Sequence, residues 1–330
     1  MLVDPRAVGG DVMQPPAVLI KQPKHSGESS AMSSDQYTSQ DPTRQYAPPD
    51  TDGDQIDYPG HTGAMQDKPD HGESSYRGRH RLDDRAAVIT GGDSGIGRAV
   101  ALAFAREGAD VMISYLPSEE QDAQQTARLI EDAGRRAVTV SGDLVEEQQC
   151  QRLVDRAVQE FGRIDILVNN AAYQMVQVGG IDDITTEQFD RVLKTNLYAM
   201  FWLCKRAIPH MQPGASIINT SSIQASDPSP ELLDYATTKA GIVINFTIGL
   251  SRMLADKGIR VNAVAPGPIW TPLIPATMPK SKVESHGQEV PLQRAGQPAE
   301  VAPAYVFFAS QESSYITAEV LGVTGGQPVT

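Results

Sequence analysis

The sequence predicts an α/β fold in which a seven-stranded parallel sheet carries helices on both faces, formed by residues 82–330 as a single domain. Two observations support this fold class. From Leu82 onward, short apolar runs alternate with helical stretches that are apolar on one face. A glycine-rich turn at residues 90–98 also joins the first apolar run to the first helical stretch, as expected for a doubly wound sheet.

Glycines delimit the expected helices. Three helical stretches end at Gly108, Gly134 and Gly162, and glycine readily takes the left-handed conformation that follows a helix. Two longer stretches are apolar over more than one face. In chain order, the expected strands are residues 86–90, 110–115, 136–140, 164–168, 215–221, 259–264 and 318–324, and the expected helices are 98–107, 119–133, 146–161, 186–211, 232–256 and 299–310. Residues 269–297, rich in Pro, Ser and Lys, are expected to form a lid.

Residues 1–81 differ from everything that follows. Their first 80 residues hold nine prolines and almost no apolar periodicity, so they bury too little apolar surface to offset the entropy lost on ordering. This favours a flexible, disordered tail. Tyr58, Met65 and Tyr76 leave a second interpretation open, an arm that wraps a neighbouring subunit. Met32 leaves open a second translation start.

Composition excludes several classes of protein. The chain carries 28 basic and 41 acidic residues, a net charge of −13, which argues against nucleic acid or an anionic membrane surface as a partner. No apolar run reaches membrane-spanning length. The two cysteines, Cys150 and Cys204, form no CxxC pair, which favours the reducing cytoplasm. The histidines show no paired ligand spacing, so no metal site is expected.

The glycine-rich turn has the residues of a phosphate cradle. Gly91 allows a sharp turn, Gly95 lets backbone N–H groups approach a pyrophosphate, and Gly97 lets the helix lie close to its strand. Such glycine spacing also arises by chance, and a turn without a ligand is the alternative. The apolar run before the turn and the helix after it favour the cradle.

Polar residues follow two later strands. Asn169-Asn170-Ala171 ends the fourth and Thr220-Ser221-Ser222 the fifth. Thirteen residues after Ser222 comes Tyr235, and Lys239 follows four residues later, on the same face of a helix. Since the carboxyl ends of parallel strands meet at one edge of a sheet, these groups are expected to share one site.

In this order and spacing, the set resembles the short-chain dehydrogenase/reductase family from Leu82 to the C-terminus. The matching residues are Thr90-Gly91-x3-Gly95-Ile96-Gly97, Asn169-Asn170-Ala171, Asn196, Ser222, Tyr235-x3-Lys239 and Pro266-Gly267. The resemblance implies a Rossmann-type fold. The stretches 91–97, 222–225 and 266–271 are similar to a bacterial subgroup described as general-stress or glucose/ribitol dehydrogenase-like oxidoreductases.

The resemblance implies an NAD(P)-dependent oxidoreductase that interconverts an alcohol and an aldehyde or ketone. Tyr235 is implied as the acid/base, and Ser222 as a hydrogen-bond partner of the substrate oxygen. Lys239 and the positive nicotinamide ring are expected to lower the pKa of Tyr235 below its ordinary value of about 10. Lys239 is also implied to bind the nicotinamide ribose. Asn196 is implied to hold a water that links Lys239 to solvent.

The implied cofactor site includes the turn and the strand ends. Its residues are Gly91, Asp93, Ser94, Gly95, Ile96, Gly97, Tyr115, Asp143, Leu144, Asn170, Ala171, Tyr235, Lys239, Pro266, Gly267, Ile269 and Thr271. Neither the acidic residue that holds ribose hydroxyls nor an arginine for a 2′-phosphate stands at the end of the second strand, where Tyr115 and Leu116 lie. Glu119 and Glu120 follow shortly after, so the sequence leans slightly to NAD over NADP.

Other assignments stay open. Gln224 and Trp270 are candidate substrate contacts, although Trp270 serves equally well as packing in the lid. A serine hydrolase using Ser222 is disfavoured, because no GxSxG elbow is present. A catalytically silent nucleotide-binding sensor or scaffold is the remaining alternative. The two long helices pair between subunits in relatives, which implies a homotetramer acting on a small molecule.

Overall fold

The computed structural model describes residues 35–50 and 55–329. Within these, seven parallel strands form one sheet in the order β3-β2-β1-β4-β5-β6-β7. The order reverses between β1 and β4, which is the switch point of a doubly wound sheet. The predicted Rossmann-type fold is therefore confirmed. The strands are β1 (Ala86–Thr90), β2 (Asp110–Tyr115), β3 (Ala137–Ser141), β4 (Ile166–Asn169), β5 (Ser216–Thr220), β6 (Arg260–Pro266) and β7 (Val320–Val323).

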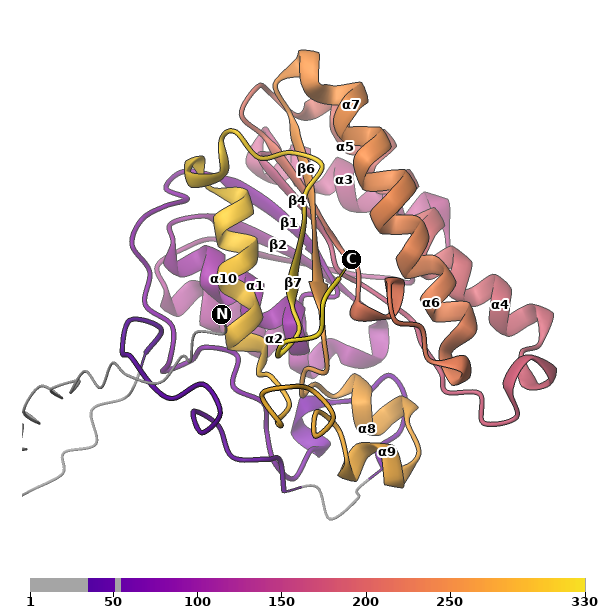
Figure 1. The fold of residues 1–330 in the computed structure, drawn as a ribbon. Coiled ribbons are helices and arrows are strands. Elements are labelled where there is room, and N and C mark those ends of the chain that lie inside the picture. The colour runs from indigo at the N-terminus through magenta and orange to yellow at the C-terminus, as the bar shows by residue number, and fades with distance from the viewer. Residues whose placement is uncertain (1–34, 51–54, 330) are drawn as a thin grey trace, which may run out of the picture. The chain divides into compact units, whose positions relative to one another are not determined.

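Helices cover both faces of the sheet (Figure 1). On one face α1 and α10 pack against the strands around Phe104 and Tyr305, and on the other α3 and α5 enclose Leu153 and Leu203. The central strands β1 and β5 are buried throughout, as expected for a parallel sheet covered on both sides. The helices of these layers are α1 (Gly95–Arg106), α2 (Glu120–Asp132), α3 (Glu147–Phe161), α4 (Thr186–Leu193), α5 (Ala199–Ala207), α6 (Leu233–Ala240), α7 (Ile248–Leu254) and α10 (Pro298–Ala309).

The two long helices expected from the sequence each contain a π-helical segment. In the first, η4 (Lys194–Tyr198) joins α4 to α5, and in the second, η8 (Gly241–Thr247) joins α6 to α7. Such segments often mark functional sites. The lid contains two short helices that the sequence did not predict, α8 (Leu273–Thr277) and α9 (Lys280–Glu284). Short 3₁₀ turns complete the chain: η1 (Thr62–Ala64), η2 (Pro117–Glu119), η3 (Gly180–Asp183), η5 (Ile208–His210), η6 (Ile223–Ala225), η7 (Pro230–Leu232), η9 (Ala255–Lys257) and η10 (Gln311–Ser313).

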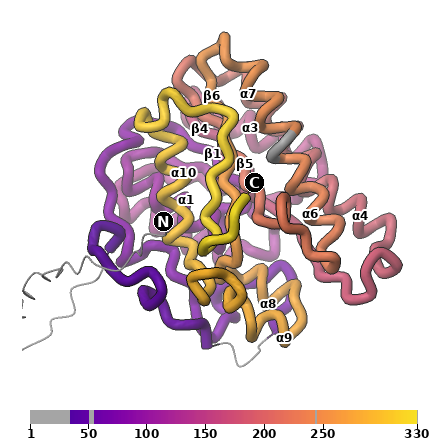
Figure 2. The backbone as a smooth tube through the Cα atoms, in the orientation of Figure 1, coloured from indigo at the N-terminus to yellow at the C-terminus, as the bar shows by residue number. Residues whose placement is uncertain are grey.

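The described part of the N-terminal segment packs on the domain of its own chain. Residues 35–50 and 55–329 belong to one compact unit, in which the described part of the segment runs along the surface of the domain (Figure 2). This part contains the short turn η1 but no α-helix or strand. The Tyr76 hydroxyl donates to Glu107 at 2.6 Å, and the Trp270 indole donates to the Asp67 carbonyl at 2.8 Å. Met65 and Tyr76 of this segment are also buried in apolar clusters of the domain. Polar and apolar contacts together join the described part of the segment to the domain, and the flexible tail and the subunit-wrapping arm stay predictions.

The remaining expectations for the N-terminus concern residues 1–34, which include Met32 and lie outside the described residues. Among the residues that the structure does describe, no helix is both long and apolar enough to cross a membrane. That described part also contains no group of three or more His, Cys, Asp or Glu side chains placed to hold a metal ion.

Candidate active site

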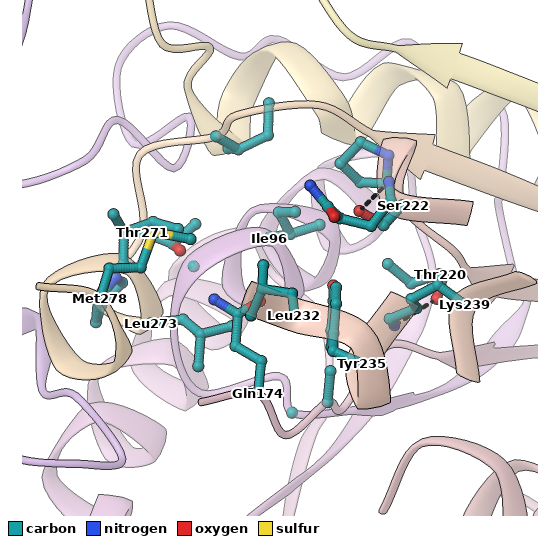
Figure 3. Close-up of a pocket in the computed structure, with 18 of the residues that line it drawn as sticks. Ile96, Gln174, Thr220, Ser222, Leu232, Tyr235, Lys239, Thr271, Leu273 and Met278 are labelled. Carbon is teal, nitrogen blue, oxygen red and sulfur yellow. Dashed lines mark hydrogen bonds between the residues drawn. The ribbon is translucent and has the colours of Figure 1, made fainter. Parts of the chain in front are cut away.

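A cavity of about 660 Å³ lies where the carboxyl ends of the strands meet. Its volume is in the range of small-molecule and cofactor sites. The lid residues Thr271, Leu273 and Met278 stand on one side, and Ser222, Tyr235 and Lys239 on the other (Figure 3). The cavity follows from the fold, because a doubly wound sheet opens a crevice at its switch point.

The glycine turn borders this cavity with the geometry predicted for it. Gly91 has φ +60° and Gly95 φ +50°, both in the left-handed region where other residues are strained. A Cβ on Gly97 would lie 1.8 Å from the Gly91 carbonyl oxygen, so only glycine lets α1 lie this close to the turn. Ser94 caps α1 without a side-chain hydrogen bond, and the first turn of α1 contains no acidic residue.

Asn170 ties the fourth strand to this turn. Its Nδ2 donates to the carbonyls of Thr90 and Gly91 at 3.0 and 3.1 Å. The Thr90 hydroxyl in turn accepts the backbone N–H groups of Asn170 and Ala171 at 2.9 and 3.0 Å. These bonds fix the ends of β1 and β4 relative to each other, so that both strands border the same ligand space.

Two hydrogen bonds hold α6 against the end of β5. The Ser221 hydroxyl donates to the Lys239 carbonyl at 3.0 Å, and Lys239 Nζ donates to the Thr220 carbonyl at 2.8 Å (Figure 3). Lys239 Nζ lies 5.3 Å from the centroid of the Tyr235 ring. Both side chains are almost fully buried, 1% exposed for Lys239 and 8% for Tyr235. This strand-and-helix unit thus brings Ser222, Tyr235 and Lys239 together.

The pKa values of Tyr235 and Lys239 are both shifted by burial. Burial raises the pKa of Tyr235 to about 12, and the hydrogen bond with the Ser222 hydroxyl opposes this rise. Burial also lowers the pKa of Lys239 to about 7, since the ammonium is removed from water. Without a cofactor, Lys239 does not lower the pKa of Tyr235, and the lowering expected from Lys239 together with the nicotinamide ring stays a prediction. At neutral pH the Tyr235 phenol holds its proton.

Asn196 lies behind the catalytic group, outside the main cavity. In η4 its Oδ1 accepts the Tyr173 N–H at 2.8 Å, and its Nδ2 donates to the Tyr173 carbonyl and to Thr238 Oγ1, each at 3.0 Å. A second space of about 10 Å³ lies between Asn196 and Lys239. The Thr195 hydroxyl and Asn169 Oδ1, which also border it, make no hydrogen bond with the described residues. This space is close to the minimum that holds one water molecule, and it has polar partners for one.

Carboxylates gather at the opposite end of the cavity, beyond the end of β2. Asp93 and Glu119 both line the cavity and are buried. Burial raises the pKa of both carboxyls, and the charge of Asp93 adds to the rise at Glu119. Behind them, Arg98 and Asp122 form a buried ion pair at 2.9 Å. Arg98 Nε also donates to the Asp93 carbonyl at 2.8 Å.

Most residues predicted for the cofactor lie on the cavity wall. Gly97 does not, because it acts through the packing of α1. The candidate substrate contact Gln224 lines the cavity, and its Oε1 accepts the Ser229 N–H at 2.6 Å. Trp270 does not line it, which corrects its assignment as a substrate contact: its ring packs with Met65 and Ile274. The wall residues among the predicted set are Gly91, Asp93, Ser94, Gly95, Ile96, Tyr115, Asp143, Leu144, Asn170, Ala171, Tyr235, Lys239, Pro266, Gly267, Ile269 and Thr271.

Several wall residues were missed by the sequence. Most of them come from loops, the lid or the N-terminal segment. Gln174 follows Asn169-Asn170-Ala171 by three residues and Leu232 precedes Tyr235 by three, so proximity to those motifs is a signal that was available. Tyr58 and Pro59 carried no such signal. The missed residues include Tyr58, Pro59, Gln174, Leu232, Leu273, Met278 and His286.

Comparisons with known proteins agree with this geometry. Residues 91–327 match a family model described as Enoyl-(Acyl carrier protein) reductase. The chain is 54% identical over 288 residues to an uncharacterized oxidoreductase, YghA, of Escherichia coli (strain K12), covering 87% of this chain and 97% of that protein. It is 48% identical over 272 residues to general stress protein 39 of Bacillus subtilis (strain 168), covering 82% and 94%. It is 47% identical over 277 residues to NADPH-dependent aldehyde reductase 1, chloroplastic, of Arabidopsis thaliana, covering 82% and 96%.

A solved structure gives the same assignment. A short-chain dehydrogenase from Burkholderia cenocepacia J2315, solved in complex with NADP, is similar at a TM-score of 0.70 and 34% sequence identity. The match covers 75% of this chain and 99% of that one. The chain belongs to the short-chain dehydrogenase/reductase family of oxidoreductases and has general stress protein 39 among its close relatives.

Proposed function

We propose that this protein is an NAD(P)-dependent oxidoreductase that interconverts an alcohol and an aldehyde or ketone, with Tyr235 as the acid/base. The observation that carries the proposal is the convergence of Ser222, Tyr235 and Lys239 on the wall of a cavity that also borders the glycine turn. A nucleotide-binding sensor has no need of such a group, which disfavours that alternative.

The residues at the glycine turn fit a dinucleotide. A side chain at Gly91 or Gly95 would be strained, and a Cβ on Gly95 would approach Thr271 to 3.2 Å. The uncapped first turn of α1 leaves backbone N–H groups for a pyrophosphate, and the helix dipole favours its negative charge. Asn170, Lys239 and Thr271 would hold the nicotinamide half. When bound, the nicotinamide supplies or accepts the hydride.

The protein's own groups handle the proton. Because burial keeps the Tyr235 phenol protonated at neutral pH, its Oη is suited to donate a proton to a carbonyl oxygen. The Ser222 hydroxyl, within hydrogen-bonding reach of Tyr235, orients that oxygen. The space beside Asn196 has room for the water through which Lys239 would return a proton.

The proposed cofactor is NAD or NADP. The slight lean to NAD is not supported, since one relative is named as NADPH-dependent and a similar structure contains NADP. Glu119 on the cavity wall would oppose a 2′-phosphate once its carboxyl is ionised, and burial raises its pKa to about 8.

The test is consumption of NADH and NADPH with a panel of aldehydes, ketones and sugars. We expect turnover with at least one carbonyl compound, and loss of that turnover in Tyr235→Phe. Binding of a dinucleotide without turnover of any compound would favour the sensor. Hydrolysis of an ester that depends on Ser222 would favour the hydrolase.

We also propose that the protein is a cytoplasmic homotetramer. The free thiols of Cys150 and Cys204 suit a reducing compartment. Phe201 on α5 and Leu233 on α6 are more than 40% exposed, and Phe189 on α4 is 39% exposed. Because α4 contacts α6, these apolar residues offer a surface for a second subunit.

Light scattering tests the tetramer. We expect the mass of a tetramer for the wild type and smaller species for Phe201→Glu. Tyr37→Glu changes an exposed aromatic residue of the N-terminal segment and should leave the mass unchanged. A monomeric wild type would contradict the proposal.

A further inference from the structure

Residues 55–62 of the N-terminal segment, called the strap below, begin against the lid. Gln55 Nε2 donates to the Met278 carbonyl at 3.1 Å, and the Ile56 N–H donates to the Pro275 carbonyl at 3.3 Å. A Cβ on Gly60, where φ is +97°, would lie 2.6 Å from the Pro272 carbonyl oxygen. The strap therefore lies in direct backbone contact with α8 and its N-terminal turn.

The other end of the strap reaches α2. The Thr62 N–H donates to Asp122 Oδ2 at 2.9 Å, and His61 Nδ1 lies 3.7 Å from the same oxygen. Asp122 also pairs with Arg98, the residue that supports Asp93. The strap thus joins two sides of the cavity, the lid and the end of β2.

Between these contacts, Tyr58 and Pro59 form part of the cavity wall. The Tyr58 ring packs edge-on against Tyr173, with centroids 5.2 Å apart. The pKa of Tyr58 is raised to about 12 by burial, and the positive charge of the nearby Arg191 opposes that rise. The negative charge of Glu119 is also close enough to affect it.

These neighbours place Tyr58 at one end of the cavity. Arg191 pairs with Asp143 at 2.9 Å, just beyond the end of β3, and Glu119 follows the end of β2. In a doubly wound sheet these two strand ends border the adenosine half of a dinucleotide. The catalytic group comes instead from β5 and α6.

We propose that the strap is the outer wall of the adenosine half of the cofactor site, and that Tyr58 is a binding residue for the adenosine moiety. This proposal rests on the proposed function, because it requires that a dinucleotide binds. The ligand class is an adenine nucleotide, whose flat ring an aromatic side chain covers well.

The strap covers the site without filling it. With Tyr58 and Pro59 in place, the cavity still measures about 660 Å³. A segment that blocked the cofactor would occupy this space. Instead, the strap lies beside Glu119, which is buried, and interactions with a bound nucleotide are stronger where water is excluded.

The experiment measures nucleotide binding directly, without turnover. Calorimetry on the full-length protein gives Kd values for ADP and 2′,5′-ADP, which contain the adenosine half alone. Stopped-flow fluorescence gives the dissociation rates of NADH and NADPH. In Tyr58→Ala, we expect the better-bound of the two adenosine probes to bind about tenfold more weakly, with faster release of the dinucleotide.

Three variants distinguish the contribution of the Tyr58 ring to nucleotide binding from other effects of the substitution. Tyr58→Phe keeps the ring and should bind within about twofold of the wild type. Tyr46→Ala removes another aromatic residue of the N-terminal segment, one that bonds to Asp70 at 2.7 Å and does not line the cavity, and its Kd should not change. Tyr58→Leu replaces the ring by apolar bulk and serves if Tyr58→Ala does not fold.

The outcomes distinguish the two proposals. Equal Kd values and release rates for wild type and Tyr58→Ala, or for Tyr58→Leu, would overturn the role of the strap alone. Tighter binding in these variants would also overturn it and would identify the strap as inhibitory. A wild type that binds no adenine nucleotide would overturn the proposed function, and the strap proposal with it.

Discussion

The two ends of the cavity are built in different ways. At the catalytic end, Ser222, Tyr235 and Lys239 come from one strand-and-helix unit, β5 and α6, and are held by local hydrogen bonds. At the adenosine end, Glu119, Asp143 and Tyr58 come from three distant parts of the chain. The first end contains a buried phenol, Tyr235, and a buried amine, Lys239, whose pKa is about 7. The second end contains the carboxyl groups of Glu119 and Asp143. The comparison shows that Ser222, Tyr235 and Lys239 are brought together by local geometry, whereas the opposite end of the cavity depends on packing between separate segments of the chain.

The largest expected effect comes from a substitution at the catalytic end alone. Tyr235→Phe removes the proton that the phenol donates, so kcat for carbonyl reduction should fall by about 10²- to 10⁴-fold. Steady-state kinetics measure the loss, and calorimetry should show a much smaller change in the dinucleotide Kd. A variant that kept its kcat would rule out Tyr235 as the acid.

The second prediction concerns the charge of Lys239. Its pKa is about 7 in the folded protein, below its ordinary value, so between pH 7 and 10 the unfolded chain binds a proton that the folded protein does not. The free energy of unfolding should therefore rise with pH in this window, by at most about 1.4 kcal/mol per pH unit. Below pH 7 both states are protonated and the contribution to the slope disappears.

Lys239→Met should remove this slope. Urea unfolding of wild type and variant at several pH values measures it, with Lys257→Met as a control, because Lys257 lies on the exposed surface. Parallel profiles for wild type and Lys239→Met would show that Lys239 is charged when buried.

The smallest expected effect concerns the charge of Glu119 at the adenosine end. Burial and the charge of Asp93 raise the pKa of Glu119 to about 8, so raising the pH from 6.5 to 9 ionises a carboxyl on the cavity wall. A carboxylate repels a 2′-phosphate, and the Kd for NADP⁺ should therefore rise a few-fold more than the Kd for NAD⁺.

Glu119→Gln cannot ionise and should lose this difference between the two cofactors. Fluorescence titrations with NAD⁺ and NADP⁺ at both pH values measure it. Glu131→Gln, on the exposed side of α2, is the matched control. If the pH dependence survived in Glu119→Gln, the discriminating group would lie elsewhere on the wall.

The sequence by itself determined the order of strands and helices and the residues of the catalytic end. Apolar periodicity identified all seven described strands to within two residues at most boundaries. The signal is strongest in the central strands, such as β1, β4 and β5, which are buried on both faces. The spacing of Ser222, Tyr235 and Lys239 predicted that they share one site, since a strand end and the following helix place them by local geometry, and the family resemblance implied their roles.

Only the tertiary structure decided the pKa values, the place of Trp270 and the role of the N-terminal segment. The pKa of Tyr235 rises because its surroundings are buried, which no neighbouring residue in the sequence reveals. Trp270 turns away from the cavity because the Asp67 carbonyl accepts its indole N–H. The strap lies on the domain through backbone hydrogen bonds to residues more than 200 positions away, such as that of Ile56 with Pro275. Almost any residue can form backbone hydrogen bonds, so the residue types of a polar, proline-rich segment do not predict where such contacts form.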